Sequence, residues 1–220
     1  MKITAFNGSP KAETSNTHVM VAAFLKGAES AGAQVENIFL VNKHINHCKG
    51  CHSCRLSADG KCVISDDMEE LLSKYVASDI AILATPLYFE TVSSVLKVFI
   101  DRNYCLGIST PPKIIAIANA GSPHRSSFQT LSRTMNFFAK HSELIAEIYA
   151  AEGPVLTAKS SRLDLIRKEY RELLYKAGQE IAVNLKLSVE TQCALEKPII
   201  PIDEYLQGFK AATEKLKARY

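Results

Sequence analysis

The sequence predicts an α/β protein whose core is an open parallel sheet of five strands, doubly wound with helices on both faces. Short apolar runs alternate with helical patterns over the first 150 residues. The run at residues 79–85 is continuously apolar from Ile80 to Ala84, which is typical of a central strand covered on both faces. A long helical crossover separates the first two runs, and such crossovers join parallel strands.

Five segments are predicted to be strands: residues 2–6, 34–41, 79–85, 113–119 and 143–150. Helices are predicted over residues 17–31, 66–77, 92–103, 126–140 and 161–187, with a last helix from residue 203. We expect Asn16 or Thr17 to be the N-cap of the first helix. Asp66 and Glu69 have the spacing of a capping box, which predicts that Asp66 is the N-cap of the second helix.

The composition argues against several classes of function. The chain has 220 residues and a net charge of +3, without a prominent run of Lys and Arg, so we expect neither nucleic acid nor a membrane as partner. No window approaches the ~18 apolar residues that a membrane span requires. The first residues lack the pattern of a signal peptide, so we expect a cytoplasmic location. Neither a hydrolase motif nor a Walker lysine occurs.

The turn after the first strand has the features of a phosphate-binding site. Asn7-Gly8-Ser9-Pro10 follows the strand directly, and the first helix begins a few residues later. Backbone N–H groups and the positive end of a helix both favour an anion there. The side chains that can donate hydrogen bonds to a phosphate are Ser9, Lys11, Ser15, Asn16 and Thr17. The alternative is a polar loop with an N-cap and no ligand.

This turn also distinguishes between two types of parallel sheet. A dinucleotide-binding sheet would carry the fingerprint G-x-G-x-x-G, which the turn lacks. A flavodoxin-like sheet has the strand order 2-1-3-4-5 and binds FMN at the crevice between its first and third strands. The sequence therefore predicts a flavodoxin-like fold with FMN as the ligand of the turn.

Two further loops are predicted at the same edge of the sheet. They contain Pro86, Leu87, Tyr88 and Phe89 after the third strand, and Asn119, Ala120 and Gly121 after the fourth. The first loop can hold an isoalloxazine ring, and the small residues of the second let a ring approach the backbone. Alternatively, Tyr88 and Phe89 cap the core. Arg102, His124 and Arg125 are also predicted near this edge, either facing nicotinamide phosphates or exposed to solvent.

Four of the six cysteines lie in one segment, with the spacing Cys48-x2-Cys51-x2-Cys54-x7-Cys62. This spacing resembles ferredoxin-type ligation of a [4Fe–4S] cluster. The alternatives are metal-free thiols, a disulfide, or zinc, which usually takes two distant pairs of cysteines. The segment follows the second strand, so a cluster there could exchange electrons with a flavin at the neighbouring turn. No ligand role is expected for Cys105, Cys193, His44, His47 and His52.

Together these motifs resemble the NAD(P)H-dependent FMN reductase family and, within it, the iron–sulfur flavoprotein branch. The resemblance includes Asp66-Asp67-Met68, Leu96-Lys97 and Asp101-Arg102, and covers about residues 1–150. It implies a flavodoxin-like fold, bound FMN, and homo-oligomers whose subunits complete each other's flavin sites. It also implies that the residues of the three loops bind FMN, and that Cys48, Cys51, Cys54 and Cys62 hold the cluster.

The expected function is that of an FMN-binding, NAD(P)H-dependent oxidoreductase of the flavin- or quinone-reductase type. Its electron acceptor would be a small molecule or a protein, and no acid–base residue is expected. The alternatives are an electron carrier between redox proteins and a thiol or metal redox-sensing module. We expect a homodimer or homotetramer. The predicted organisation is an FMN-binding domain at residues 1–187, with a cysteine-rich insert at 43–65, and a C-terminal extension at 188–220.

Overall fold

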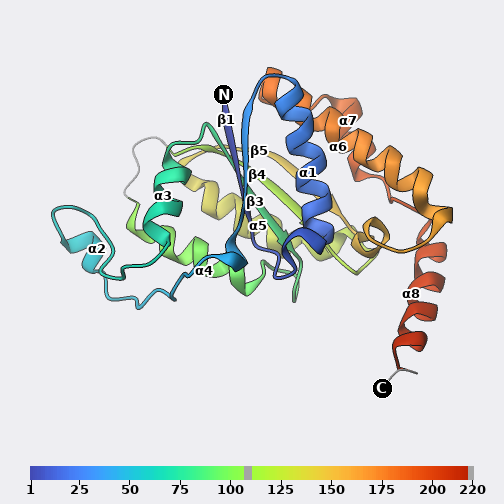
Figure 1. Ribbon diagram of the computed structural model, residues 1–220, viewed down its shortest axis with the longest axis horizontal. Helices are drawn as coiled ribbons and strands as arrows, with labels where there is room; N and C mark the ends of the chain where they lie inside the picture. The colour runs from blue at the N-terminus through green and yellow to red at the C-terminus, as the bar shows by residue number, and fades with distance from the viewer. Residues whose placement is uncertain (107–110, 218–220) are drawn as a thin grey trace.

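Five parallel strands form the centre of the molecule in the order β2-β1-β3-β4-β5 (Figure 1). The computed structural model describes residues 1–106 and 111–217. The strands are β1 (Lys2–Asn7), β2 (Gln34–Phe39), β3 (Ile80–Pro86), β4 (Lys113–Asn119) and β5 (Leu144–Ala150). In the register of β1, Ile3 pairs with Val35 of β2 and Ile80 of β3. The predicted flavodoxin-like fold and its strand order are confirmed.

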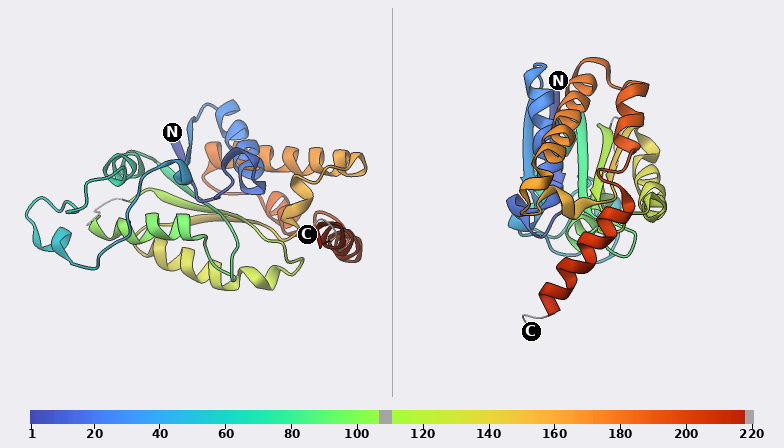
Figure 2. Two further views of the ribbon diagram at one scale, coloured as in Figure 1. Left: turned by 60° about the horizontal axis from the view of Figure 1, so that its bottom comes forward. Right: turned by 90° about the vertical axis from the view of Figure 1, so that its right-hand side faces the viewer.

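Helices cover both faces of the sheet (Figure 2). On one face lie α1 (Asn16–Ser30) and α6 (Asp164–Asn184). On the other lie α3 (Met68–Val76), α4 (Ser94–Arg102) and α5 (Gln129–Phe138). Successive strand side chains alternate between the two apolar cores that result. The sheet is therefore buried on both faces, which explains the continuous apolar run of β3.

Three further helices and several 3-10 turns complete the described chain. The remaining helices are α2 (Ser53–Leu56) and α7 (Val189–Glu196), which are short, and α8 (Ile202–Lys217) at the end of the described chain. The 3-10 turns are Ala12–Thr14, Leu40–Asn42, Asn103–Cys105, Arg125–Phe128, Ala139–His141, Gly153–Leu156 and Ser161–Leu163. The predicted helices over residues 126–140 and 161–187 therefore begin as 3-10 turns, and α2 and α7 were not predicted. Within the described residues, no helix is both long and apolar enough to span a bilayer.

Two expected helix starts differ from the structure. The N-cap of α1 is Ser15, not Asn16 or Thr17, because the Ser15 hydroxyl accepts the backbone N–H of His18 at 3.0 Å. The N-cap position of α3 is Asp67, one residue beyond the predicted Asp66. The Asp66 carboxylate still accepts the N–H of Met68 at 3.1 Å, but a buried arginine engages it as well.

The C-terminal segment first packs on the domain and then leaves it. Within α7, Thr191 and Leu195 are buried. α8 extends away from the body of the molecule (Figures 1 and 2). At its start, the buried Tyr205 donates its hydroxyl hydrogen to the carbonyl of Gly121 at 2.7 Å. Residues 218–220 of the predicted extension lie outside the described residues.

α1 and α6 cross at two glycines. A Cβ at Gly27 would overlap the carbonyl oxygen of Tyr175, and a Cβ at Gly178 would overlap that of Phe24. The two backbones therefore touch directly, with no room for a side chain at either position. Such close approach is a common reason for glycine inside a helix, where its conformational freedom otherwise costs stability.

We predict that Gly27→Ala lowers the free energy of unfolding by about 1–3 kcal/mol, because the added methyl group forces the two helices apart. Denaturant unfolding followed by circular dichroism measures the change. Gly208 of α8 is the control, since a Cβ there meets no atom within 4 Å. Gly208→Ala should be neutral or stabilise by about 0.5–1 kcal/mol. Equal effects of the two substitutions would contradict the crossing as described.

Candidate functional site

The predicted phosphate turn lies at the carboxyl end of β1 and is held against β3 and α4. The N–H of Gly8 donates to the carbonyl of Ala84 at 2.7 Å, and the hydroxyl of Ser93 donates to the carbonyl of Gly8 at 2.6 Å. A Cβ at Gly8 would lie 2.5 Å from the Cβ of Leu96, so only glycine lets the turn lie this close to α4. The turn is therefore fixed before any ligand binds.

The helix that follows the turn presents unpaired donors. Within the described residues, the backbone N–H groups of Asn16 and Thr17 have no acceptor. The Ser15 hydroxyl is already engaged, since it donates to the carbonyl of Ala12 at 2.7 Å and accepts from His18. Ser9 is buried, and Lys11 is exposed at the turn. This arrangement fits an anion, because free N–H groups and the positive end of a helix point to the same place.

Asn119 joins the three loops of this edge. Its Nδ2 donates to the hydroxyl of Thr17 at 2.8 Å, and its carbonyl accepts the N–H of Leu87 at 2.8 Å. Its side chain also leaves no room for a Cβ at Gly153, which would lie 2.8 Å from Asn119 Oδ1. At Gly121, in contrast, a Cβ would meet no atom within 4 Å. The third loop thus combines a rigid start with open space beside it.

The loop after β3 turns sharply outward. Tyr88 and Thr91 exchange two backbone hydrogen bonds of 3.1 Å, and Phe89 and Glu90 between them have φ values of +47° and +58°. The side chain of Phe89 is fully exposed, and that of Tyr88 is 47% exposed. The alternative that Phe89 caps the core is therefore wrong. Pro86 and Leu87, which precede the two aromatics, are half-buried.

The cysteine segment forms a loop at the C-terminal end of α4 and carries the short helix α2. The phosphate turn contacts the other end of α4, so the segment does not lie directly beside the turn as expected. Cys48 and Cys51 are exposed, Cys54 and Cys62 are half-buried, and all four are free thiols. Among residues 1–106 and 111–217, no group of three or more metal-ligating side chains is already assembled. The donor set suits a thiolate-bound cluster, because all four sulfurs lie on one accessible segment. The segment would have to close around the cluster.

A fifth cysteine lies near this segment. Burial raises the pKa of Cys105, and the charges of Cys54 and Cys62 raise it further. The Cys105 thiol donates to the carbonyl of Arg102 at 3.2 Å. The neighbouring Tyr104 contacts the segment too, since its hydroxyl lies 3.1 Å from His52 Nδ1. The end of α4 and the 3-10 turn after it therefore form the surface on which the cysteine segment rests.

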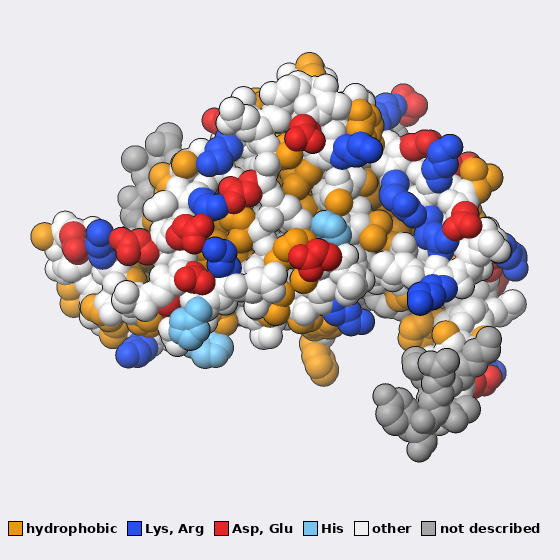
Figure 3. Space-filling view, viewed as in Figure 1, with side chains coloured by type: hydrophobic (Ala, Val, Ile, Leu, Met, Phe, Trp, Pro, Cys, Tyr) orange, Lys and Arg blue, Asp and Glu red, His pale blue; other side chains and the backbone are white. Residues whose placement is uncertain are grey.

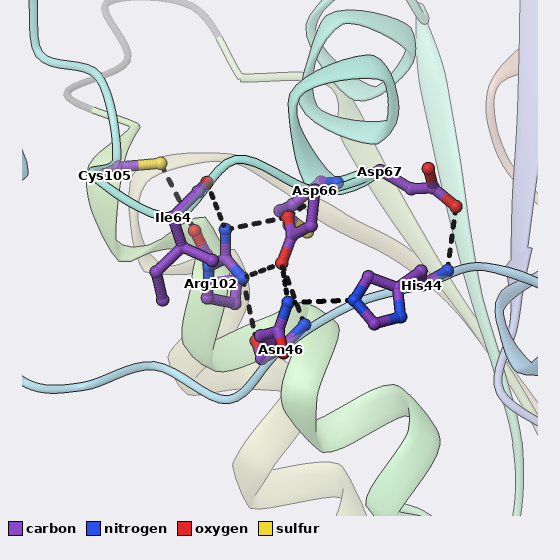
Figure 4. A network of polar contacts seen from close by, with 8 residues as sticks. His44, Asn46, Ile64, Asp66, Asp67, Arg102 and Cys105 are labelled. Carbon is purple, nitrogen blue, oxygen red and sulfur yellow. Dashed lines mark hydrogen bonds and ion pairs between the residues drawn. The ribbon is translucent and has the colours of Figure 1, made fainter.

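A buried ion pair joins the cysteine segment to α4 (Figure 4). Arg102 donates to Asp66 through Nη1 at 2.7 Å and through Nη2 at 3.0 Å, and both side chains are at most 1% exposed. Burial alone would raise the pKa of Asp66, but the guanidinium and the N–H groups of Asn46 and Met68 hold it well below its usual range. Arg102 therefore does not face a nicotinamide, as was one expectation.

The charge of Arg102 also interacts with one of the four clustered cysteines, Cys62. Burial alone would lower the pKa of this guanidinium, but the Asp66 carboxylate raises it, and the nearby Cys62 sulfur adds to the rise. Of the other cations near the edge, Arg125 donates to the carbonyl of Tyr149 at 2.8 Å, and His124 is exposed. Arg125 thus connects the 3-10 turn Arg125–Phe128 to the end of β5. It is half-buried, so it is not simply a charge exposed to solvent.

Two hollows of the surface lie away from the predicted flavin site. A groove of about 460 Å³ between α1 and α6 includes Lys26, Lys168 and Arg171 in its lining. On the face in Figure 3, positive and negative side chains are interspersed, with several Lys and Arg gathered over α6. A larger groove of about 940 Å³ is lined by residues of α4, of α5 and of the cysteine segment, including Cys48. Neither groove is lined by the residues of the three loops.

A flavodoxin-like sheet with a phosphate turn at the edge shared by β1 and β3 defines a class of flavin-binding proteins. Comparison with known sequences agrees: this chain belongs to the NADPH-dependent FMN reductase family, whose model matches residues 1–151.

Curated relatives narrow the comparison to one branch of this family. The chain is 36% identical over 148 residues to an iron-sulfur flavoprotein of Methanocaldococcus jannaschii, covering 66% of this chain and 75% of that protein. It is 38% identical over 129 residues to an iron-sulfur flavoprotein of Archaeoglobus fulgidus, covering 56% of this chain and 57% of that protein.

Solved structures support the fold. The NAD(P)H:quinone oxidoreductase from Methanothermobacter marburgensis superposes with a TM-score of 0.63 at 15% identity, covering 82% of this chain and 96% of that one. An FMN-dependent NADH-azoreductase from Bacillus anthracis, in complex with FMN, gives a TM-score of 0.61 at 12% identity, covering 82% and 99%. At these identities the likeness concerns the fold alone.

Several residues that support the site were not predicted from the sequence. Ser93 was not singled out, although a serine directly before an apolar helical pattern is a recognisable N-cap. It caps α4 and also holds the carbonyl of Gly8. The pairing of Asp66 with Arg102 had no local signal, because the two residues are far apart in the chain. Asn119 was predicted as a wall of the flavin site, not as the link between the loops.

We predict that Asp66→Asn costs about 3 kcal/mol of unfolding free energy at pH 7, because it leaves Arg102 buried without its partner. The folded-state pKa of Asp66 is lowered, so its contribution is complete above the unfolded value of about 3.9 and is lost as the pH falls below it. Urea unfolding of both proteins from pH 7 to pH 3 measures this difference.

The control for this prediction is Asp101→Asn on α4, next to Arg102 in the chain. Asp101 pairs with Lys97 at 2.6 Å, but both side chains are about half exposed, so the expected cost is below about 1 kcal/mol. The difference in unfolding free energy between the unsubstituted chain and Asp66→Asn should be constant from pH 7 to 5 and shrink below pH 4. A difference that is unchanged at pH 3 would contradict the lowered pKa.

Proposed function

We propose that this chain is an NAD(P)H-dependent FMN oxidoreductase that acts on a small-molecule or protein electron acceptor. The observation that carries the proposal is the set of unpaired N–H groups at the start of α1, linked through Asn119 to the two other loops of the same edge. Membership of the FMN reductase family supports FMN as the ligand. When bound, FMN supplies electron transfer between a reduced nicotinamide and the acceptor.

In this proposal the three loops divide the cofactor between them. The FMN phosphate is held by the N-terminus of α1 and the phosphate turn, with the donors Ser9, Lys11, Ser15, Asn16 and Thr17. Since the Ser15 hydroxyl is engaged, its part is to cap the helix and orient the free N–H groups. The isoalloxazine ring lies against the loops formed by Pro86, Leu87, Tyr88, Phe89, Asn119, Ala120 and Gly121. The open space at Gly121 supports this arrangement.

We further propose that Cys48, Cys51, Cys54 and Cys62 hold a [4Fe–4S] cluster. The free and accessible thiols support it, as do the names of the two curated relatives. A single compact segment also suits a cluster better than zinc, which usually takes two distant cysteine pairs. We expect the protein to work in the cytoplasm. We also expect a homodimer or homotetramer, because the exposed side chain of Phe89, beside the proposed flavin ring, is accessible to a second subunit.

A second candidate function is electron transfer between protein partners without turnover of a small molecule. The exposure of Cys48 and Cys51 favours it, because a cluster at the surface can pass single electrons to a docked protein. The two candidates differ in whether a reduced nicotinamide alone can reduce the flavin.

The absorption spectrum and metal content of anaerobically purified protein, before and after addition of a reduced nicotinamide, distinguish the two candidate functions. We predict flavin absorption bands, iron and sulfide in equal amounts, little zinc, and bleaching of the flavin within seconds of adding NADH or NADPH. Bleaching by reduced ferredoxin but not by either nicotinamide would favour the electron carrier. A colourless protein that does not take up added FMN would contradict both functions.

We predict that Thr17→Val weakens FMN binding by about 10- to 100-fold, because it removes a hydroxyl at the proposed phosphate site and leaves the Asn119 amide without its acceptor. Fluorescence quenching of FMN titrated with cofactor-free protein measures the affinity. Thr17→Ser keeps the hydroxyl and should bind FMN as the unsubstituted chain does. Thr134→Val removes a hydroxyl that bonds only within α5 and is the matched control. Equal affinities for the Val and Ser variants would contradict the role of Thr17.

A further inference from the structure

The ion pair between Asp66 and Arg102 lies where the two ends of the cysteine segment meet. Arg102 Nη1 donates to the carbonyl of Asn46 at 2.7 Å, and Nη2 donates to the carbonyl of Ile64 at 3.4 Å. Asn46 precedes and Ile64 follows residues 47–63, which contain all four clustered cysteines. One guanidinium thus bridges the two ends of this loop (Figure 4).

Asp66 completes the connection from the other side. Its Oδ2 accepts the backbone N–H of Asn46 at 2.8 Å and the Asn46 amide at 3.1 Å, while Oδ1 accepts the N–H of Met68. Next to it, the Asp67 carboxylate accepts the N–H of His44 at 2.8 Å. The first end of the loop is therefore tied to the start of α3 as well as to α4. Water competes little for these bonds, because the ion pair is buried.

We propose that Asp66 and Arg102 are positioning residues for the cysteine site, which close loop 47–63 at its base so that its four thiols can bind one cluster. The inference rests on the proposed cluster. Bringing the ends of a flexible loop together costs entropy, and a closed base removes that cost from metal binding. Residues behind a metal's direct ligands often act in this way.

The side chain at position 102 is suited to this task. Arginine presents a planar set of N–H donors that can engage a carboxylate and two carbonyls at once, whereas lysine presents a point charge on a flexible stem. Arg102 uses Nη1 and Nη2 for four acceptors from three residues. Lysine would keep the charge beside Asp66 and Cys62 but lose the bridge between Asn46 and Ile64. The two substitutions Arg102→Gln and Arg102→Lys therefore separate bridging from charge.

The test compares cluster retention in these variants. Each protein is reconstituted anaerobically with Fe²⁺, sulfide and FMN, and bipyridyl then removes the iron. We expect both Arg102 variants to release iron at least tenfold faster than the unsubstituted chain, with FMN content unchanged. Lys97→Gln, which removes an exposed cation from the same helix, should release iron at the unsubstituted rate. Unchanged release in Arg102→Lys would overturn bridging, and unchanged release in Arg102→Gln would overturn the whole proposal.

Amide hydrogen exchange on the metal-free protein tests the closed base without the cluster. The N–H groups of His44, Asn46 and Met68 should be protected in the unsubstituted chain and exchange at least tenfold faster in the Arg102 variants. Equal exchange would overturn the proposal. If the unsubstituted chain takes up no iron and sulfide, the proposed cluster fails, and this measurement alone decides whether the ion pair closes the loop.

Arg102→Gln leaves Asp66 buried without a counter-charge, so this variant can fail to fold. The double variant Asp66→Asn/Arg102→Gln removes both charges together and replaces it in that case. Thermal unfolding and bound FMN verify that the double variant is folded. It should show the same rapid iron release and amide exchange, and values equal to those of the unsubstituted chain would overturn the proposal.

Discussion

The candidate flavin site depends on one buried residue, Asn119, at the end of β4. Its side-chain amide donates to the Thr17 hydroxyl at the start of α1, and its backbone carbonyl accepts the N–H of Leu87 after β3. Parallel strands deliver their carboxyl ends to one edge, but this alone does not fix the loops relative to one another. A buried asparagine that bonds one loop through its side chain and another through its backbone does so, because movement of either loop would leave a polar group unpaired away from water.

The strands and the phosphate turn could be predicted because their signals are local. β4 was predicted with its observed bounds, since Pro112 and Gly121 frame a short apolar run. The N-cap of α1 was misplaced by one or two residues because Ser15, Asn16 and Thr17 are consecutive and all three residue types can cap a helix. Hydrogen-bond geometry, which the sequence does not contain, decides among them.

Interactions between distant residues account for most of what could not be predicted. Nothing near Arg102 indicates that its partner follows the cysteine segment, since the bonded pair is joined only by folding. The exposure of Phe89 could not be predicted either, because an aromatic residue at a strand end is usually buried. α7 is short and weakly amphipathic, so its pattern did not distinguish it from an irregular tail. Local patterns thus predicted the scaffold, and long-range polar contacts determine how its loops are held.

The helix α4 (Ser94–Arg102), with its N-cap Ser93, contacts both loops in which the redox centres are proposed. At its N-terminus, Ser93 and Leu96 hold the phosphate turn, and at its C-terminus, Arg102 holds the cysteine loop. At ~1.5 Å per residue this helix is about 13 Å long. A helix fixed at both ends is a rigid spacer, so it sets the separation between the phosphate turn and the base of the cysteine loop.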